Sequence, residues 1–135
     1  IKEGTIIVLE NIYYDFNKSA IRKGAAQDLE ALAQLMNIYP SMQIELGAHT
    51  DSRGTDEYNL DLSLRRAQSA KEFLIQRGIA ANRIRTVGYG ETQLRNHCEE
   101  GVNCSDAEHL LNRRTEVKVL NINERVKVSY EEDSN

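Results

Sequence analysis

The sequence predicts a two-layer α/β (α+β) sandwich, in which helices cover mainly one face of a mixed sheet. Three observations indicate this fold class. Apolar and polar residues alternate along residues 42–49, as they do in a strand with one buried face. Apolar residues recur at spacings of three and four along residues 21–39 and 60–74, as in amphipathic helices. The elements follow one another as β-α-β-α-β-(α)-β, an order that packs helices against a single sheet.

The first third of the chain predicts two strands and one helix. Residues 5–9 are β-branched and apolar, which favours a strand. Alternation at Ile12, Tyr14 and Phe16 extends strand character to residue 16. The expected apolar face of the helix consists of Ile21, Ala25, Leu29, Leu32, Met36 and Tyr39. Pro40 ends this helix because proline cannot continue the hydrogen-bond ladder.

The middle of the chain predicts a strand, a turn and a long helix. The expected buried face of the strand consists of Met42, Ile44, Leu46 and Ala48. Residues 50–54 form the turn, and Thr55 fits the N-cap of the helix, followed by two acidic residues that the helix dipole favours. The expected buried stripe of this helix consists of Leu60, Leu64, Ala67, Ala70 and Leu74. Gly78 fits the position after the helix, where a left-handed backbone favours glycine.

The last third predicts shorter elements around an irregular segment. A short strand occupies residues 84–90, and residues 94–105 show no periodicity. A short helix at residues 106–112 and a strong strand at residues 115–122 follow. Residues 126–130 are a candidate for one more strand.

Composition limits the domain count and the classes of partner. The chain has 135 residues, of which 40% are hydrophobic and 28% charged, so we expect one globular domain over residues 1–130 and a disordered tail at residues 131–135. The net charge of −4 argues against a general electrostatic grip on nucleic acid or anionic lipid. The longest apolar stretch, residues 6–9, is far shorter than the roughly 20 residues of a spanning helix.

Asp51 and Arg66 predict a receptor for a group that bears both charges. Asp51 lies in the predicted turn, and Arg66 lies on the predicted helix, seven residues after Asn59 and therefore on the same helical face. A guanidinium fork matches a carboxylate, and a carboxylate accepts hydrogen bonds from an ammonium. An amino acid with a free ammonium and a free carboxylate is such a ligand. The alternative is a pair of ordinary solvated charges, worth about 0–1 kcal/mol.

Five segments of the chain resemble a known family. They are IYYDFNKSAI (12–21), HTDSRGTDEYNLDLSLRRAQSAKEFL (49–74), GI (78–79), RIRTVGYGE (83–91) and NRRTEV (112–117). Their order and spacing are similar to those of the OmpA-like domain, the periplasmic module of outer-membrane protein A, peptidoglycan-associated lipoprotein and flagellar-motor MotB proteins. The combination of HTD, N…LS..RA and NRR is far more specific than any one of these motifs.

The resemblance implies non-covalent binding of peptidoglycan through meso-diaminopimelate in the stem peptide. The free end of that residue carries both an ammonium and a carboxylate. By position, the resemblance assigns the ammonium to Asp51 and the carboxylate to Arg66. The other residues that it implies at the pocket are Asn59, Phe16, Asn17 and Arg113.

Three of these residues also have an ordinary structural interpretation. Asn59 can form a helix hydrogen bond, and Phe16 can belong to the core. Arg113 can pair with acidic groups at the edge of the sheet. The sequence leaves these alternatives open.

Cys98 and Cys104 enclose residues 99–103, a loop that a disulfide can close where the geometry permits. Because the resemblance implies an oxidising compartment, we expect this disulfide, with a stabilisation of about 2 kcal/mol. A rival interpretation uses His97, Cys98, Cys104 and His109 as zinc ligands. Their spacing matches no familiar zinc finger, so we expect no metal and no cofactor.

An enzyme is one alternative class of function. His49, Asp51 and Ser52 are residue types of hydrolytic triads, but four consecutive positions do not readily align a nucleophile, a base and an orienting acid. The sequence also contains no nucleophile elbow and no phosphate-binding loop. We therefore expect no catalytic activity.

The expected function is to anchor the outer membrane or an envelope protein to the cell wall. The resemblance implies a periplasmic location in a Gram-negative bacterium, with membrane association through a region that this sequence does not contain. The expected partner is peptidoglycan and not nucleic acid, and a homo-oligomer stays open. The alternative is a periplasmic protein-docking domain of a Tol-Pal-like or motor-stator-like complex.

Overall fold

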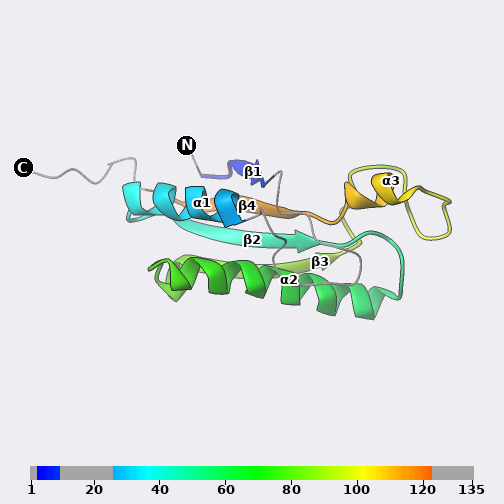
Figure 1. Ribbon diagram of the computed structural model, residues 1–135, viewed down its shortest axis with the longest axis horizontal. Helices are drawn as coiled ribbons and strands as arrows, with labels where there is room; N and C mark the ends of the chain where they lie inside the picture. Colours follow the sequence, from blue (N-terminus) through cyan, green and yellow to red (C-terminus); the bar gives the residue numbers. More distant parts are fainter. Residues whose placement is uncertain (1–2, 10–25, 123–135) are drawn as a thin grey trace, which may run out of the picture.

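The computed structural model describes residues 3–9 and 26–122 as a mixed α/β structure (Figure 1). The elements are β1 (Ile6–Val8), α1 (Ala26–Ile38), β2 (Gln43–His49), α2 (Asp56–Gln76), a 3₁₀ turn (Ala81–Arg83), β3 (Ile84–Gly90), α3 (Asp106–Leu110) and β4 (Thr115–Asn121). Each predicted element that falls within the described residues is present. The predicted strand extension to residue 16, the start of the first helix, the candidate strand at residues 126–130 and the tail lie outside them.

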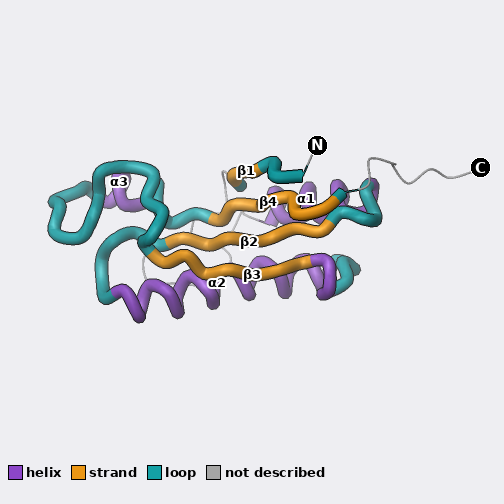
Figure 2. The backbone as a smooth tube through the Cα atoms, turned by 180° about the vertical axis from the view of Figure 1, so that it is seen from behind, coloured by secondary structure: helices purple, strands orange, loops and turns teal. Residues whose placement is uncertain are grey.

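The sheet is mixed, and two helices cover one of its faces. The strand order is β1-β4-β2-β3, with β2 and β3 parallel and the other neighbours antiparallel. In Figure 2 the strands lie in front of both α1 and α2, so the two helices share the opposite face. The predicted two-layer sandwich with a mixed sheet is therefore confirmed.

The core lies between this face and the two helices. Its largest members share complete burial: Leu29, Met36, Met42, Ile44, Leu46, Leu74, Val117 and Val119. The expected alternation in β2 accounts for Met42, Ile44 and Leu46, and the pattern of α1 accounts for Leu29 and Met36. Burial of such side chains is the main favourable contribution to folding.

The ends of α2 follow the sequence prediction. Thr55 Oγ1 accepts a hydrogen bond from the Tyr58 backbone N at 3.1 Å, which makes Thr55 the N-cap. Gly78 has φ of 91°, and its N–H bonds Ile75 O at 2.9 Å while the N–H of Ile79 bonds Leu74 O at 3.1 Å. This pair of bonds is a Schellman motif, whose left-handed residue favours glycine. Local signals therefore define both ends of the helix.

The prediction of a single buried face for β2 is wrong. All residues from Ile44 to His49 are buried, including Glu45 and His49 on the face that was expected to be exposed. Glu45 Oε2 accepts a hydrogen bond from the Tyr89 hydroxyl at 2.6 Å, and His49 stacks on Tyr89 with ring centroids 5.0 Å apart. β2 is an inner strand with a neighbour on each side, and side chains of β3 cover its second face.

The predicted buried stripe of α2 is also partly wrong. Leu60 and Leu64 are 46% and 38% exposed. The buried face consists of Asn59, Leu62, Ser63, Arg66, Ala67, Ala70 and Leu74. The cause is a close approach to β3: a Cβ on Gly88 would lie 2.5 Å from the backbone N of Leu64. Ser63 fits this contact, since its Oγ accepts a hydrogen bond from Gly90 N at 2.9 Å.

Arg83 stabilises the C-terminal end of α1. Its Nη2 donates to Met36 O at 2.7 Å and to Tyr39 O at 2.8 Å, and its Nε donates to Met42 O at 3.0 Å. The last carbonyls of a helix have no partner within the helix, and a cation near them interacts favourably with the helix dipole. Arg83 thus satisfies carbonyls of α1 and of the turn that leads into β2.

We expect Arg83→Gln to lower the free energy of unfolding by about 2–3 kcal/mol, since three hydrogen bonds to a charged group are lost. Urea denaturation followed by circular dichroism measures this loss. Arg77→Gln is the matched control, because Arg77 pairs with Glu30 on the surface, where an ion pair is worth about 0–1 kcal/mol. Equal losses of unfolding free energy in the two variants would show that the Arg83 contacts stabilise the fold no more than a surface ion pair does.

Candidate functional site

The candidate site lies at one end of the sheet. β2 and β3 run parallel and β4 runs antiparallel to β2, so the ends of β2 and β3 meet the start of β4. Asp51 follows β2, Glu91 follows β3, and Arg113 precedes β4. The first turns of α2 lie at the same end, on the right in Figure 1. The topology therefore brings together side chains that are far apart in the chain.

Asp51 is buried, and arginines engage its carboxylate. Arg53 donates from Nη2 to Oδ2 at 2.8 Å and from its backbone N to Oδ1 at 3.0 Å. Arg113 donates from Nη1 to Oδ2 at 2.9 Å. Burial raises the pKa of Asp51, but the hydrogen bonds from Arg53 and Arg113 outweigh this effect and hold the pKa below its usual value. Asp51 is therefore ionised at neutral pH.

Arg66 and Asn59 lie on the buried face of α2 beside Asp51. Arg66 is completely buried and donates from Nη1 to the carbonyl of His49 at 3.2 Å. Asn59 donates from Nδ2 to the carbonyl of Asp51 at 3.3 Å and to Glu91 Oε1 at 3.0 Å. The Asn59 amide thus links α2 to the segments that follow β2 and β3.

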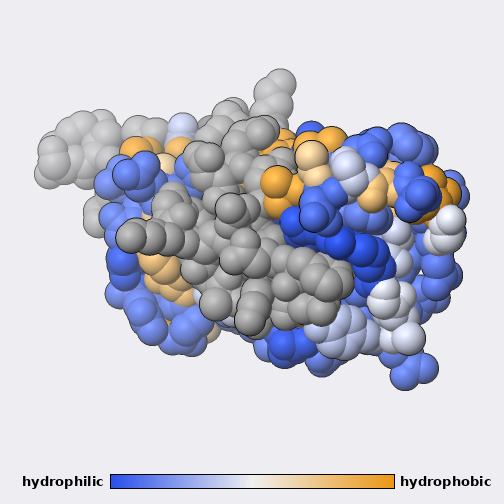
Figure 3. Space-filling model, turned by 45° about the vertical axis from the view of Figure 1, so that its right-hand side comes forward, coloured by the Kyte–Doolittle hydropathy of each residue, from blue (hydrophilic) through white to orange (hydrophobic). Residues whose placement is uncertain are grey.

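A small concavity lies among these groups, and in the unbound protein their side chains leave no room in it for a water molecule. Its lining consists of Thr50, Asp51, Arg53, Asn59, Leu62, Arg66 and Arg113. The structure therefore brings together four of the predicted ligand-binding residues. Phe16 and Asn17 lie outside the described residues. The visible surface at the α3 end of the molecule is mainly hydrophilic (Figure 3).

The charge balance of the concavity differs from the sequence prediction. The resemblance implied Asp51, Arg66 and Arg113 at the pocket. The structure adds Arg53, so three arginines lie around the single carboxylate of Asp51. Two further carboxylates lie next to this lining, since Asp106 pairs with Arg53 and Glu91 accepts a hydrogen bond from Asn59. The sequence reasoning missed Arg53 and Glu91, although Arg53 lies two residues after Asp51 in the turn and Glu91 ends the RIRTVGYGE segment.

The loop before α3 contacts the turn that contains Asp51. Cys98 and Cys104 form a disulfide with their Cα atoms 6.0 Å apart, as expected. Ser52 Oγ donates to Cys98 O at 2.5 Å, and Arg53 Nη1 pairs with Asp106 at 3.1 Å. The disulfide-closed loop therefore supports one wall of the site.

The rival zinc set from the sequence differs from what the structure brings together. Within the described residues, the group close enough to share a metal ion is His97, Cys98, Cys104 and Glu108. His109 is buried and does not belong to this group. Adjacent residues on α3 point in different directions, and sequence spacing does not show which of them faces the loop.

The three residue types of a hydrolytic triad do not interact as one. Ser52 donates to a backbone carbonyl of the disulfide loop. His49 stacks on Tyr89, and within the described part of the chain neither of its ring nitrogens has a hydrogen-bond partner. The carboxylate of Asp51 bonds arginines. The geometry therefore does not connect a nucleophile, a base and an acid.

We expect the free energy of unfolding to fall by about 3 kcal/mol as the pH drops from 6.5 to about 4. Burial, and then repulsion from Arg114, lower the pKa of His49 to about 4, against 6.5 for a free histidine. Between these values the unfolded chain binds a proton that the folded chain excludes, so acid favours unfolding. The lowered pKa of Asp51 acts in a different window, as the pH falls below 3.8.

Urea denaturation at several pH values measures this effect. The variant His49→Gln should flatten the slope between pH 4 and 6.5, whereas His97→Gln, at an exposed position, should retain it. A slope that persists unchanged in His49→Gln would assign the titration to another group.

Residues 13–107 match the family model described as the OmpA family. The chain belongs to the OmpA family. Outer membrane porin F of Pseudomonas fluorescens is 38% identical over 109 residues, which are 81% of this chain and 32% of that protein. The peptidoglycan-associated lipoprotein of Brucella melitensis is 44% identical over 86 residues, which are 64% of this chain and 51% of that protein. The chain thus spans about half the length of these relatives or less.

Solved structures of OmpA-like domains have the same fold. The peptidoglycan-associated lipoprotein of Burkholderia pseudomallei matches with a TM-score of 0.73 at 26% identity, over 80% of this chain and 87% of that one. The periplasmic domain of MotB from Helicobacter pylori matches with a TM-score of 0.69 at 21% identity, over 89% and 78% of the two chains. Across residues 3–9 and 26–122 of this OmpA family member, no helix is long and apolar enough to cross a membrane.

Proposed function

We propose that this OmpA family domain binds cell-wall peptidoglycan non-covalently and anchors the outer membrane or an envelope protein in the periplasm of a Gram-negative bacterium. Relatives named as peptidoglycan-associated lipoproteins support this proposal. The observation that carries it is local: Asp51 and Arg66, from separate elements, line one concavity. The ligand group is the free end of diaminopimelate, which has an ammonium and a carboxylate on one carbon.

The geometry supports a division of roles between the two charges. Asp51 is ionised and accepts hydrogen bonds, so it suits the ammonium. Arg66 offers a planar guanidinium for the carboxylate. The rigid frame of sheet and helix holds both groups before the ligand arrives, which lowers the ordering cost of binding.

Arg53 covers Asp51 in the unbound protein. Its side chain is 31% exposed, whereas that of Arg113 is 9% exposed. The ligand ammonium competes with Arg53 for the same carboxylate, and Arg53 is the partner that yields because it is the more exposed of the two arginines. Arg113 stays in place and holds the carboxylate of Asp51 in position.

The proposed affinity of a single site is modest. A hydrogen bond to a charged group contributes about 1.5–3 kcal/mol, and displacement of Arg53 and ordering of the ligand offset much of this. Peptidoglycan repeats the same group many times along the polymer. Several domains on one membrane therefore gain avidity of about 10²–10⁴ when they engage it together.

A comparison of two stem peptides tests the proposal. A peptide with diaminopimelate should bind at least about 10-fold more tightly than the same peptide with lysine, because lysine lacks the second carboxylate and leaves buried Arg66 without this partner. Arg66→Lys should reduce this preference, since an ammonium cannot form the forked contact. Isothermal titration calorimetry measures all four affinities.

Equal affinities of the wild-type domain for the two peptides would exclude recognition of the second carboxylate. Incubation with purified sacculi provides a further check on the class of function. We expect the domain to sediment with the sacculi and to release no soluble muropeptides. Release of muropeptides would indicate an enzyme.

A further inference from the structure

We propose that reduction of the Cys98–Cys104 disulfide creates a binding site in this loop for one Zn²⁺ ion or a similar divalent cation. The ligands are the two cysteine thiolates, the His97 imidazole and the Glu108 carboxylate. The cation would bind whether or not peptidoglycan is present. The four ligands belong to the loop and α3 beside the concavity, and none of them lines it.

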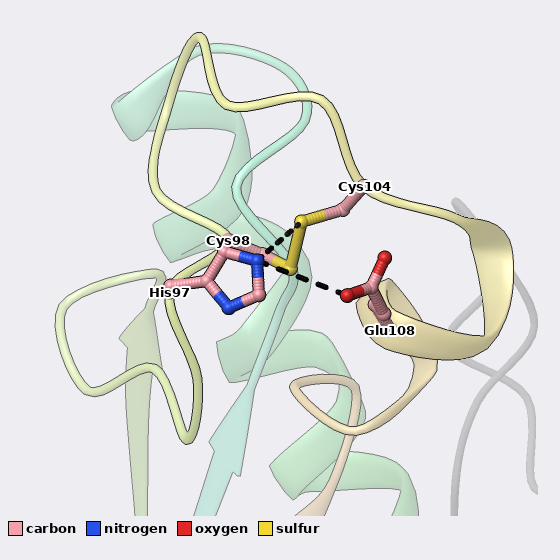
Figure 4. A group of neighbouring side chains, drawn as sticks. All are labelled: His97, Cys98, Cys104 and Glu108. Carbon is pink, nitrogen blue, oxygen red and sulfur yellow. Dashed lines mark hydrogen bonds and ion pairs between the residues drawn. A yellow bond between two sulfur atoms is a disulfide. The ribbon is translucent and has the colours of Figure 1, made fainter.

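The four ligand atoms already lie together. They are within 4.8 Å of one another, and they come from the loop and from α3. His97 Nε2 is 4.0 Å from Cys104 Sγ and 3.8 Å from Glu108 Oε2. Figure 4 shows the imidazole and the Glu108 carboxylate turned toward the two sulfurs.

The donor set and the spacing suit zinc. Zn²⁺ prefers four ligands of sulfur, nitrogen and oxygen at about 2.0–2.3 Å, and the edges of such a tetrahedron are about 3.3–3.8 Å. The observed distances of 3.8 and 4.0 Å from His97 Nε2 therefore need only small changes. The larger movement is the separation of the two sulfurs once their bond is broken.

Contacts other than the disulfide hold the ligands in place. Asn96 Oδ1 accepts a hydrogen bond from Cys98 N at 3.1 Å, and Asn96 Nδ2 donates to Glu108 O at 2.9 Å. Glu108 Oε1 accepts from the backbone N of Ser105 at 2.9 Å in a capping box, while Oε2 faces His97. Groups that orient ligands in this way raise metal affinity. These contacts involve no sulfur, so reduction leaves them available.

The redox state of the disulfide determines whether the loop can bind the ion. In the oxidised loop the sulfurs are bonded to each other, which leaves one imidazole and one carboxylate as ligands. A dithiol reductant opens the loop: its thiolate attacks the partly exposed Cys104 sulfur, and the Cys98 sulfur leaves as a thiolate. The second thiol of the reductant then releases Cys104, so the dithiol is oxidised to a disulfide and two cysteines are formed. Metal binding displaces the two thiol protons.

The bound ion replaces the cross-link that reduction removes. It connects residues 98 and 104 through two thiolates and adds α3 through Glu108. The carbonyl of Cys98 accepts the hydrogen bond from Ser52, next to Asp51. The turn that contains Asp51 therefore keeps its support in both redox states.

Titration of the whole chain with Co²⁺, a spectroscopic probe for zinc sites, tests the proposal. The protein is reduced with an excess of a phosphine under argon, and an oxidised sample is titrated in parallel. The reduced sample should bind one Co²⁺ per chain, with thiolate charge-transfer absorption and the strong visible bands of a tetrahedral ion. Zn²⁺ should displace the Co²⁺, and the oxidised sample should show neither absorption.

Variants separate the complete site from an adventitious pair of thiols. His97→Gln and Glu108→Gln should each weaken Zn²⁺ binding at least about 10-fold in the reduced chain, because even a group that only orients a metal ligand typically contributes about 10-fold to 100-fold. Glu99→Gln is the matched control in the same loop, since Glu99 lies outside the ligand group, and it should bind as the wild type does. Equal binding by reduced and oxidised chains, or wild-type affinity in both ligand variants, would overturn the proposal.

Discussion

Replacing Asp51 by Asn is expected to lower the affinity for a diaminopimelate-containing muropeptide by about 10-fold to 100-fold. Asn has the shape of Asp but no charge, so the ligand ammonium loses an ionised acceptor. A hydrogen bond to a charged group is worth about 1.5–3 kcal/mol, and each 1.4 kcal/mol is a factor of ten in affinity. Isothermal titration calorimetry with a soluble muropeptide measures the change.

Asp61→Asn is the matched control for this substitution. Asp61 lies on α2, its side chain is 67% exposed, and it pairs with Arg65 on the surface. We expect this variant to bind as the wild type does. Asp51 also neutralises buried Arg113, so Asp51→Asn is expected to lower stability as well. Circular dichroism must therefore show that both variants are folded at the temperature of the titration. Equal affinities of the two folded variants would remove Asp51 from the proposed site.

Gly88→Ala is expected to lower the free energy of unfolding by about 3 kcal/mol, near the upper end of the range for an overpacked core. The added Cβ would lie 2.5 Å from the backbone N and 2.9 Å from the Cα of Leu64. Both atoms belong to the backbone of α2, so no side-chain rotation relieves the contact. The helix must move away from β3, and Asn59 and Arg66 move with it. Muropeptide affinity should therefore fall together with stability.

Gly47→Ala is the control for this prediction. A Cβ at Gly47 would lie 2.7 Å from Cε2 of the Tyr89 ring, on the face of the sheet opposite the helices. A ring edge can shift where a helix backbone cannot, so the loss of stability should be smaller and muropeptide affinity should stay unchanged. Urea denaturation and calorimetry measure the two effects. A greater loss of stability in Gly47→Ala than in Gly88→Ala would contradict the proposed role of the Gly88 contact.

Local patterns in the sequence determined the elements and the fold class. Thr55 and Gly78 identified the ends of α2 because each satisfies backbone groups within a few residues of itself. Apolar alternation identified β2, and Met42, Ile44 and Leu46 belong to the core as predicted. The HTD and LS..RA segments pointed to the OmpA family, and residues 13–107 match its family model. Each of these signals lies within a short stretch of chain.

The tertiary structure decided which face of α2 is buried. Helical periodicity shows that Leu60 and Leu64 share a side, but it does not orient that side toward the sheet. The close approach at Gly88 orients it, because only the side with Ser63 can face a strand at such a short distance. Leu60 and Leu64 therefore face outward, and Asn59 and Arg66 face inward to the concavity.

The tertiary structure also decided the charges of the site. The resemblance implied Arg113 at the pocket, but only the structure shows that it reaches the carboxylate of Asp51 from 62 residues away. Likewise, Glu91 reaches Asn59 from 32 residues away. Such pairs depend on the strand order, which places the ends of β2 and β3 beside the start of β4. Sequence periodicity reports the direction of a side chain relative to its own element. Only the packed sheet sets the distances between elements, and electrostatic interactions depend on those distances.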